Sequence, residues 1–208
     1  VMIEWVRQNQ GLFRPGALLT DVSGVKCHVV DAIQGFLRQD LEFIGSHPMA
    51  GKEVYGVRNS DEGIFKIANF IVTPTEKNTS GAVETAREIG RLLEFHTITE
   101  LAPAAHDEIV GFVSQLTHAI AVSLMTCNDD EDLQNYTGDS FRDLTRIARI
   151  NEKMWSELFL LNRQELISQI DSFTAELLRM RGMLERQDRA ALEEMFIRST
   201  QRRALFDR

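Results

Sequence analysis

The chain has few cysteines, no cluster of basic residues and no long uninterrupted apolar run. Its two cysteines, Cys27 and Cys127, stand far apart, without a CxxC pair or a metal-binding spacing. We therefore expect reduced, mostly buried thiols in a cytoplasmic protein, and no bound metal. No run approaches the roughly 20 apolar residues that span a bilayer, and no signal segment opens the chain. These absences disfavour metal-dependent and membrane-bound classes of protein.

The charge balance excludes a further class of partner. The formal net charge is -8, and the Lys and Arg residues are scattered among acids on segments with helical spacing. Binding to nucleic acid needs clustered Lys and Arg, so we do not expect it here. A small anionic substrate remains possible if a few Arg or His side chains are placed locally. The 208 residues, 43% of them hydrophobic, suffice for one large domain or two small ones.

Residues 1–101 alternate between short apolar runs and segments in which apolar residues recur at helical intervals. This alternation predicts βαβ units and a mainly parallel sheet. The expected strands are 17–20, 42–45, 69–73 and 95–98. The expected helices are 1–9, 25–37 and 80–93, the last capped by Thr79 or Ser80.

Residues 102–208 show helical spacing only, so the fold class is α/β plus all-α, with a boundary near residues 101–103. The expected helices are 106–125, 141–149, 152–161, 164–186 and 189–205, with Asn151 and Asp188 as caps. Segment 106–125 is apolar on nearly all sides, which predicts a buried central helix. It is about as long as a membrane span, but four polar or charged residues disfavour that reading: Asp107, Glu108, Gln115 and His118. A helical domain of this kind often completes its core by dimerising.

An α/β half followed by a helical half is a common plan of nicotinamide-dependent dehydrogenases. Their phosphate-binding signature, G-x-G-x-x-G after the first strand, does not occur before Thr20. The chain also begins inside a helical pattern, without an initiating strand. Either an N-terminal segment lies outside this sequence, or the protein has no Rossmann domain. The pattern alone leaves both explanations open.

Four segments decide between them: residues 20–26 (TDVSGVK), 46–51 (SHPMAG), 111–119 (GFVSQLTHA) and 141–148 (FRDLTRIA), the last followed by Met154-Trp155. In this order, the chain resembles the prephenate and arogenate dehydrogenase family. The resemblance implies that residues 1–101 are the C-terminal part of a Rossmann-like domain lacking its first βαβ units. It also implies that 102–208 form a helical domain that binds substrate and mediates a homodimer. The cofactor would be NAD or NADP, with NAD slightly favoured.

The resemblance further implies an activity in tyrosine biosynthesis. A hydride leaves the ring carbon of prephenate that carries the 4-hydroxyl, carbon dioxide departs, and 4-hydroxyphenylpyruvate results. Two alternatives stay open. The first is an arogenate dehydrogenase or another two-domain hydroxyacid dehydrogenase, and the second is a binding or dimerisation module without catalysis.

His47 is the residue we expect to hydrogen-bond the 4-hydroxyl and accept its proton. The unperturbed pKa of histidine, about 6.5, leaves the ring largely neutral at pH 7. We expect His47 in a tight loop, fixed by Pro48 and Gly51, after the strand 42–45. The alternative is a loop histidine that merely caps a turn.

Arg146 is the expected clamp for a substrate carboxylate, because its planar guanidinium can make two parallel hydrogen bonds. Asp143 precedes it by one helical turn, so it either pairs with Arg146 on the surface or orients it in the site. His118 would bind substrate, and it favours prephenate because some arogenate-specific members lack it. Its alternative is a satisfied core histidine. Glu53 resembles a family position near the substrate side chain, but a solvated loop acid fits equally.

Ser23 departs from the family pattern, which places Gly and then Ser before Val-Lys. Here the order is Ser23-Gly24, so the hydroxyl is displaced by one residue and its catalytic and cofactor-binding role is in doubt. Asp21 is a second candidate for a cofactor contact. Lys26 either lies near the site or begins the next helix. Trp155 is expected beneath the site as core, and surface or capping roles are expected for the remaining histidines: His28, His96 and His106.

Overall fold

A computed structural model describes residues 1–51 and 56–207 of the chain. The described residues form two compact units, Val1–Leu166 and Ile167–Arg208. The first unit contains the sheet and most of the helices. The domain boundary expected at residue 101 marks a change from mixed to purely helical structure, whereas the two compact units meet after Leu166. The expected boundary therefore stays a prediction.

The sheet has four strands in the order β1 (Leu18–Thr20), β2 (Glu42–Pro48), β3 (Asn69–Thr73) and β4 (Thr97–Glu100). The pairs β1–β2 and β3–β4 are parallel, whereas β2 and β3 are antiparallel. The predicted, mainly parallel α/β half is therefore confirmed, with one antiparallel pair at its centre. The fourth strand lies two residues later than expected.

β2 runs three residues further than the sequence predicts. After β1 ends at Thr20, the ladder between β2 and β3 continues and pairs His47 with Ile71. His47 therefore lies within a strand, and the expected loop placement is wrong. The continued pairing fixes the backbone of His47 more firmly than a loop would.

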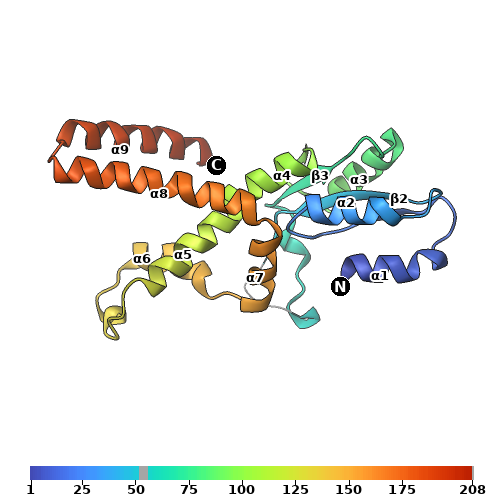
Figure 1. Cartoon of the computed structure of the whole chain (residues 1–208), viewed down its shortest axis with the longest axis horizontal. Coiled ribbons are helices and arrows are strands. Elements are labelled where there is room, and N and C mark those ends of the chain that lie inside the picture. Colours follow the sequence, from blue (N-terminus) through green and yellow to red (C-terminus); the bar gives the residue numbers. More distant parts are fainter. Residues whose placement is uncertain (52–55, 208) are drawn as a thin grey trace. The chain divides into compact units, whose positions relative to one another are not determined.

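Helices cover both faces of the sheet (Figure 1). On one face, Phe43 contributes to a core with residues of α1 (Met2–Asn9) and α2 (Cys27–Phe36). On the other face, its neighbour Ile44 joins a core that includes Ala86 of α3 (Ser80–Leu92). Adjacent residues of a strand point to opposite faces, so β2 supplies both cores. Thr79 caps α3 as predicted, because its side chain accepts a hydrogen bond from the Ala82 amide.

Gly45 allows α2 to approach β2 closely. A Cβ at this position would lie 2.9 Å from a methyl carbon of Val30 and 3.2 Å from Cδ of Lys26. Only glycine leaves the space that these two side chains occupy. The residue thus brings the start of α2 against the strand that carries His47.

A long helical run follows the sheet: α4 (Pro103–Val110), a π-helical segment (Gly111–Leu116) and α5 (Thr117–Thr126). The sequence predicts this helix but not its exposure, since Ile109, Phe112 and Val113 are all more than 40% exposed. The expectation of a buried helix is wrong for the single chain. The run is also long and apolar enough to cross a membrane, by length and composition only, in line with the length noted in the sequence. Core helices of soluble proteins pass the same test.

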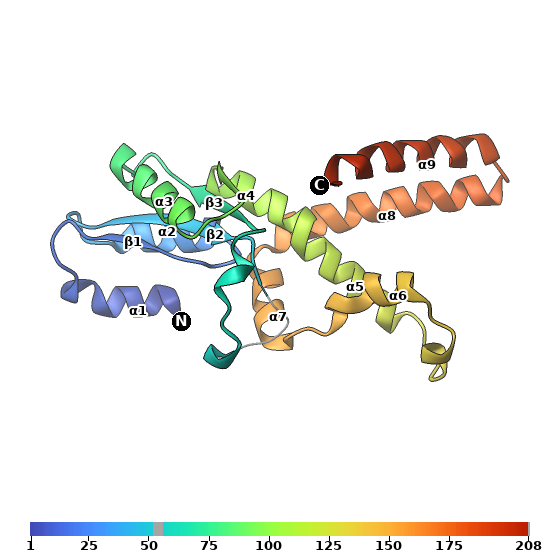
Figure 2. The same cartoon turned by 180° about the vertical axis from the view of Figure 1, so that it is seen from behind.

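The first unit ends with α6 (Asp139–Thr145), the 3-10 segment Arg146–Ala148, α7 (Glu152–Leu161) and the start of α8 (Arg163–Glu185). Figure 2 shows α6 beside α5, and the two helices are in contact. Asn151 caps α7 as predicted, accepting from the Met154 amide. Other 3-10 segments are Gln10–Leu12, Val57–Asn59, Glu62–Ile64, Leu133–Asn135 and Ala204–Phe206.

The second unit is a helical hairpin formed by residues 167–185 of α8 and by α9 (Arg189–Arg203) (Figure 1). The turn between them places Gln187 at a φ of 53°, and Asp188 caps α9 as predicted. Arg198 of α9 contacts Glu176 of α8 at 3.0 Å. Both helices leave large apolar side chains exposed, among them Leu177, Leu178, Phe196 and Ile197.

Candidate active site

A cavity of about 580 Å³ opens beside His47. Gly24 from the loop after β1, His47 and the residues up to Gly51 line one side of it. Ser114, Gln115 and His118 from the π-helical segment and α5 line another side, together with residues of α7. The cavity therefore gathers all four sequence segments that carry the family resemblance.

His47 is the first member of a hydrogen-bonded chain of three side chains. Its Nδ1 lies 2.8 Å from Nε2 of His106, and Nδ1 of His106 lies 2.7 Å from Oδ1 of Asp107. His106 is fully buried, so its expected surface or capping role is wrong. His28 and His96 are exposed, as predicted.

Asp107 is held in turn by the start of α2. Its Oδ1 accepts from the Lys26 amide at 2.7 Å, and its Oδ2 accepts from the Cys27 amide at 2.8 Å. Burial raises the pKa of the Asp107 carboxyl, but hydrogen bonds from His106 and these two amides outweigh it and lower the pKa. The carboxylate is therefore ionised and immobile at neutral pH.

Burial is the main cause that lowers the pKa of His47 to about 3, and the neighbouring His106 and Lys26 act in the same direction. Charges on Asp21 and Asp107 act in the opposite direction and are outweighed. His47 is thus neutral at pH 7, which is the state that can accept a proton. The sequence predicts the same state from the unperturbed pKa alone.

Asp21, Ser23 and Lys26 form a second, largely buried cluster at the end of β1. Lys26 Nζ lies 2.6 Å from Asp21 Oδ2 and 3.1 Å from Ser23 Oγ, and the Ser23 hydroxyl also hydrogen-bonds to Asp21. Neither Asp21 nor Ser23 lines the cavity. Both side chains make hydrogen bonds within the cluster and to nearby backbone, since Asp21 also accepts from the Ser46 amide and Ser23 also donates to the Val25 backbone oxygen. Their predicted catalytic and cofactor roles stay predictions.

His118 and Trp155 form one wall of the cavity. Their rings stack, with centroids 3.7 Å apart and an angle of 29° between the planes. His118 Nδ1 lies 2.9 Å from the backbone oxygen of Ser114, one helical turn earlier, and this contact fixes the ring. Trp155 is half-buried and lines the cavity, so its expected place in the core beneath the site is wrong.

Two buried amides that sequence reasoning missed connect the helices around the cavity. Asn162 Nδ2 donates to the backbone oxygen of Asp107 and to Oε1 of Gln115, both at 2.9 Å. Gln115 Nε2 donates to the backbone oxygen of Leu158 at 3.3 Å. These bonds hold α7, which carries Trp155, against the helix that carries His106. In the sequence, the polar residues at positions 115 and 162 stand among apolar ones, and this pattern could have indicated buried, hydrogen-bonded amides.

Arg146 and Asp143 are not among the side chains that line the cavity, whereas Arg149, one turn later, is. Sequence reasoning missed Arg149. The roles predicted for Arg146 and Asp143 stay predictions, as does that of His118, and Glu53 lies outside the described residues.

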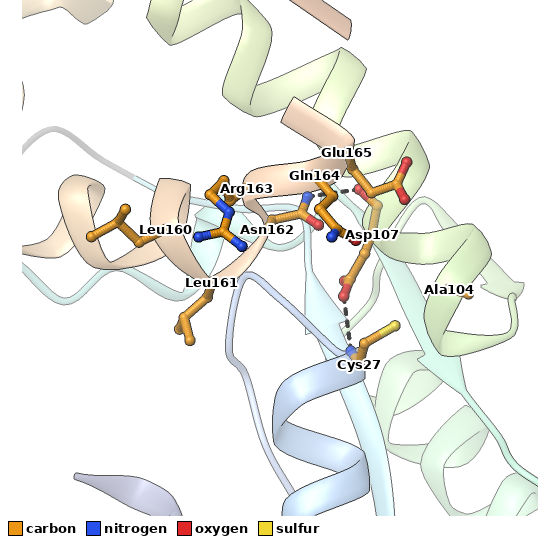
Figure 3. Close-up of a pocket in the computed structure, with 9 residues that line it drawn as sticks. All are labelled: Cys27, Ala104, Asp107, Leu160, Leu161, Asn162, Arg163, Gln164 and Glu165. Carbon is orange, nitrogen blue, oxygen red and sulfur yellow. Dashed lines mark hydrogen bonds between the residues drawn. The ribbon is translucent and has the colours of Figure 1, made fainter. Parts of the chain in front are cut away.

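A second cavity of about 280 Å³ lies next to Asp107, on the side of Cys27 and Asn162 (Figure 3). Its other lining residues include Leu161, Arg163 and Glu165. Burial, followed by the charge of Asp107, raises the pKa of the Cys27 thiol to about 12. Cys27 therefore stays protonated and is a poor nucleophile. Cys127 is exposed, which corrects the expectation that both thiols are mostly buried.

The described residues fit part of a dinucleotide site. Ligands of open α/β sheets bind beyond the carboxyl ends of parallel strands, and Gly24 follows β1 at such an end and lines the cavity with His47. This fits the reactive end of a nicotinamide cofactor. The 208 residues contain no glycine-rich turn for its phosphates. Across residues 1–51 and 56–207, no group of three or more His, Cys, Asp or Glu side chains is arranged to hold a metal ion.

Comparison with known proteins agrees with this architecture. Residues 1–98 match the family model of the prephenate dehydrogenase nucleotide-binding domain, and residues 102–198 match that of its dimerization domain. The prephenate dehydrogenase of Bacillus subtilis is 32% identical over 184 residues, which cover 86% of this chain and 49% of that protein. The cyclohexadienyl dehydrogenase of Zymomonas mobilis is 27% identical over 89% of this chain and 65% of its own length.

A solved structure shows the same fold. The prephenate dehydrogenase of A. aeolicus, in complex with hydroxyphenyl propionate and NAD+, superposes with a TM-score of 0.90 at 27% identity. The match covers 99% of this chain and 73% of that one. The chain spans about half the length of its Bacillus subtilis relative and about two thirds of the Zymomonas mobilis one. Both domain models match in sequence order and together cover nearly all of the chain, so the chain belongs to the prephenate dehydrogenase family.

Proposed function

We propose that this chain forms the substrate site of an NAD(P)-dependent dehydrogenase that converts prephenate to 4-hydroxyphenylpyruvate. The main support is the position of His47, a neutral imidazole that lines the cavity of about 580 Å³. His47 is hydrogen-bonded to His106, which is hydrogen-bonded to Asp107. The relatives that support the proposal are named prephenate and cyclohexadienyl dehydrogenases. The place of the reaction would be tyrosine biosynthesis in the cytoplasm.

In this proposal His47 acts on the 4-hydroxyl of the substrate ring. Its Nε2 accepts the hydroxyl proton as the carbon–oxygen bond gains double-bond character. A bound nicotinamide would supply the acceptor for the hydride that leaves the same carbon. The bond to the ring carboxylate breaks, carbon dioxide leaves, and its electron pair completes the aromatic ring. The proton held on His47 then returns to the oxygen, which gives the phenol.

Substrate carboxylates need cations near this cavity. Arg149 lines it, and Arg146 precedes Arg149 by one turn. We propose that one or both guanidiniums bind a carboxylate, since this group makes paired, charge-assisted hydrogen bonds. His118, which also lines the cavity, would position the substrate ring or side chain. We propose prephenate rather than arogenate as the substrate. We propose NAD rather than NADP as the cofactor.

The test compares turnover of prephenate and arogenate, each with NAD and with NADP, by the full-length protein and its His47→Asn variant. We expect kcat to fall by about 10²-fold to 10⁴-fold in the variant, with little change in KM. His96→Asn, a substitution of an exposed histidine, is the matched control and should leave both constants unchanged. A His47→Asn variant that retains near-wild-type turnover would refute the role of His47.

The alternative of a module without catalysis makes a different prediction. Isothermal titration of the 208-residue chain with NAD, NADP and 4-hydroxyphenylpyruvate separates the two. Binding of the aromatic product, weakened by Arg149→Ala, supports a substrate site in the cavity. Absence of product binding by both the chain and the full-length protein would favour the non-catalytic module.

A further inference from the structure

In the hydrogen bonds that join His47, His106 and Asp107, the donor and the acceptor of each bond can be assigned. We propose that His106 and Asp107 are positioning residues that hold His47 in the tautomer protonated at Nδ1, so that its unprotonated Nε2 faces the substrate. The catalytic meaning of this arrangement rests on the function proposed above. The tautomer itself is a property of the folded chain and does not depend on that function.

Asp107 sets the direction of the hydrogen bonds. An ionised carboxylate only accepts hydrogen bonds, so Nδ1 of His106 must donate to it across the 2.7 Å contact. The carboxylate cannot rotate away, because the Lys26 and Cys27 amides hold both of its oxygens. Asp107 is 5% exposed and His106 is fully buried, so water does not compete for these bonds.

The donor role of His106 Nδ1 determines which nitrogen of His47 carries a proton. A neutral imidazole with its proton on Nδ1 has a lone pair on Nε2 and accepts there. The 2.8 Å contact therefore requires His47 to donate from Nδ1. Its own Nε2 then carries the lone pair that a general base needs. The opposite tautomer would present an N–H donor to the substrate hydroxyl and could not take its proton.

The other charged groups near His47 do not change this assignment of donors and acceptors. Lys26 and Asp21 face it from the loop after β1 and the start of α2, and they are paired with each other at 2.6 Å. The side chains of both residues also hydrogen-bond with Ser23, and Asp21 accepts from the Ser46 amide. The hydrogen-bond partner of His47 Nδ1 is His106. His106 is the partner that decides its tautomer.

Nitrogen NMR of histidine side chains tests this directly on the 208-residue chain, labelled with ¹⁵N-histidine at about pH 8, where unperturbed imidazoles are neutral. The spectrum of His47→Asn assigns the His47 signals by their loss. We expect a single tautomer of His47, protonated at Nδ1. The exposed His28 and His96 serve as internal references and should average between tautomers.

Two substitutions of His106 separate the contact to His47 from the contact to Asp107. An asparagine at this position would keep an amide near Asp107 but would be too short to reach His47. A glutamine can present its N–H to Asp107 and its carbonyl oxygen to His47. We expect His106→Asn to release His47 into a mixture of tautomers and His106→Gln to restore the Nδ1-protonated form. His47 protonated at Nε2 in the wild type, or fixed at Nδ1 in a folded His106→Asn variant, would overturn the proposal.

Turnover by the full-length protein distinguishes this proposal from the proposed function. We expect His106→Asn to lower kcat by about 10²-fold and to change the pH profile of kcat, while KM changes little and His106→Gln recovers part of the loss. Active wild type with no loss in His106→Asn would contradict the positioning role and leave the function standing. Inactive wild type with the expected tautomer would contradict the function and leave the hydrogen-bond assignment standing.

Discussion

Lys26 Nζ lies 2.6 Å from Asp21 Oδ2, and neither side chain has any exposed surface. The other oxygen of Asp21 accepts from the Ser46 amide at 3.0 Å, next to His47. The pair thus joins the loop after β1 to the strand that carries the candidate base. Burial lowers the pKa of Lys26 despite the attraction of Asp21, so the ammonium depends on its partner to remain charged.

We therefore expect Asp21→Asn to be strongly destabilising, because it leaves a buried ammonium without a compensating charge. Loss of one partner of a buried pair costs about 3–5 kcal/mol of unfolding free energy. Urea denaturation followed by circular dichroism measures it. The control is Asp40→Asn, which removes an exposed partner of Arg38 and should leave the midpoint unchanged.

The double variant Asp21→Asn/Lys26→Met tests the physical reason. If the uncompensated ammonium causes the loss, the added Lys26→Met change should recover a large part of the stability. A double variant no more stable than Asp21→Asn alone would show that the hydrogen bonds of Asp21 to the Ser23 and Ser46 amides matter more than its charge.

The lowered pKa of His47 predicts acid sensitivity. The unfolded chain binds a proton at His47 below about pH 6.5, whereas the folded chain resists it until about pH 3. Between these values the unfolded state binds more protons, so the unfolding free energy falls as the pH falls. One such group contributes a slope of up to about 1.4 kcal/mol per pH unit.

Urea denaturation at several pH values from about 7 to about 4, within this window, should therefore show a smaller loss of stability for His47→Asn than for the wild type. His96→Asn, on the surface, should follow the wild type. Parallel curves for all three proteins would mean that His47 is not desolvated in the folded chain.

The sequence identified several residues that line the cavity but not His106, the hydrogen-bond partner of His47. His47, His118 and Trp155 lie in recognisable segments, and the structure brings all three to one cavity. His106 lies near the start of α4 in no recognisable motif, and it becomes a partner of His47 only because α4 packs near β2. A contact between residues 59 positions apart leaves no periodic signal in one sequence.

The strand geometry was only partly predictable for a related reason. Alternating helices and strands indicate parallel pairs, but the antiparallel pairing of β2 with β3 depends on the connection between them, which has no helix of crossover length in its described part. Pro48 and Gly51 suggested a loop from His47 onward, whereas the strand continues through Pro48. The pairing of His47 with Ile71 outweighed that local signal.

The exposed face of the long helix leads to the last prediction. Ile109, Phe112 and Val113 are all exposed, and all lie within the region that matches the family's dimerization domain. We propose that a second copy of the chain covers this face. Exposed apolar surface of this kind is typical of an interface between subunits.

Phe112→Asp should then shift the protein toward monomers in sedimentation velocity at micromolar concentration, because a carboxylate would be desolvated at the interface. Leu12→Asp is the matched control, since Leu12 is more exposed but lies in the nucleotide-binding region, and it should sediment as the wild type does. A wild type that is monomeric at every concentration, or a Phe112→Asp variant that remains dimeric, would place the subunit contact elsewhere. Loss of dimer in Phe112→Asp alone would also explain why so apolar a helix is exposed in the single chain: its burial is completed by the partner rather than by the fold.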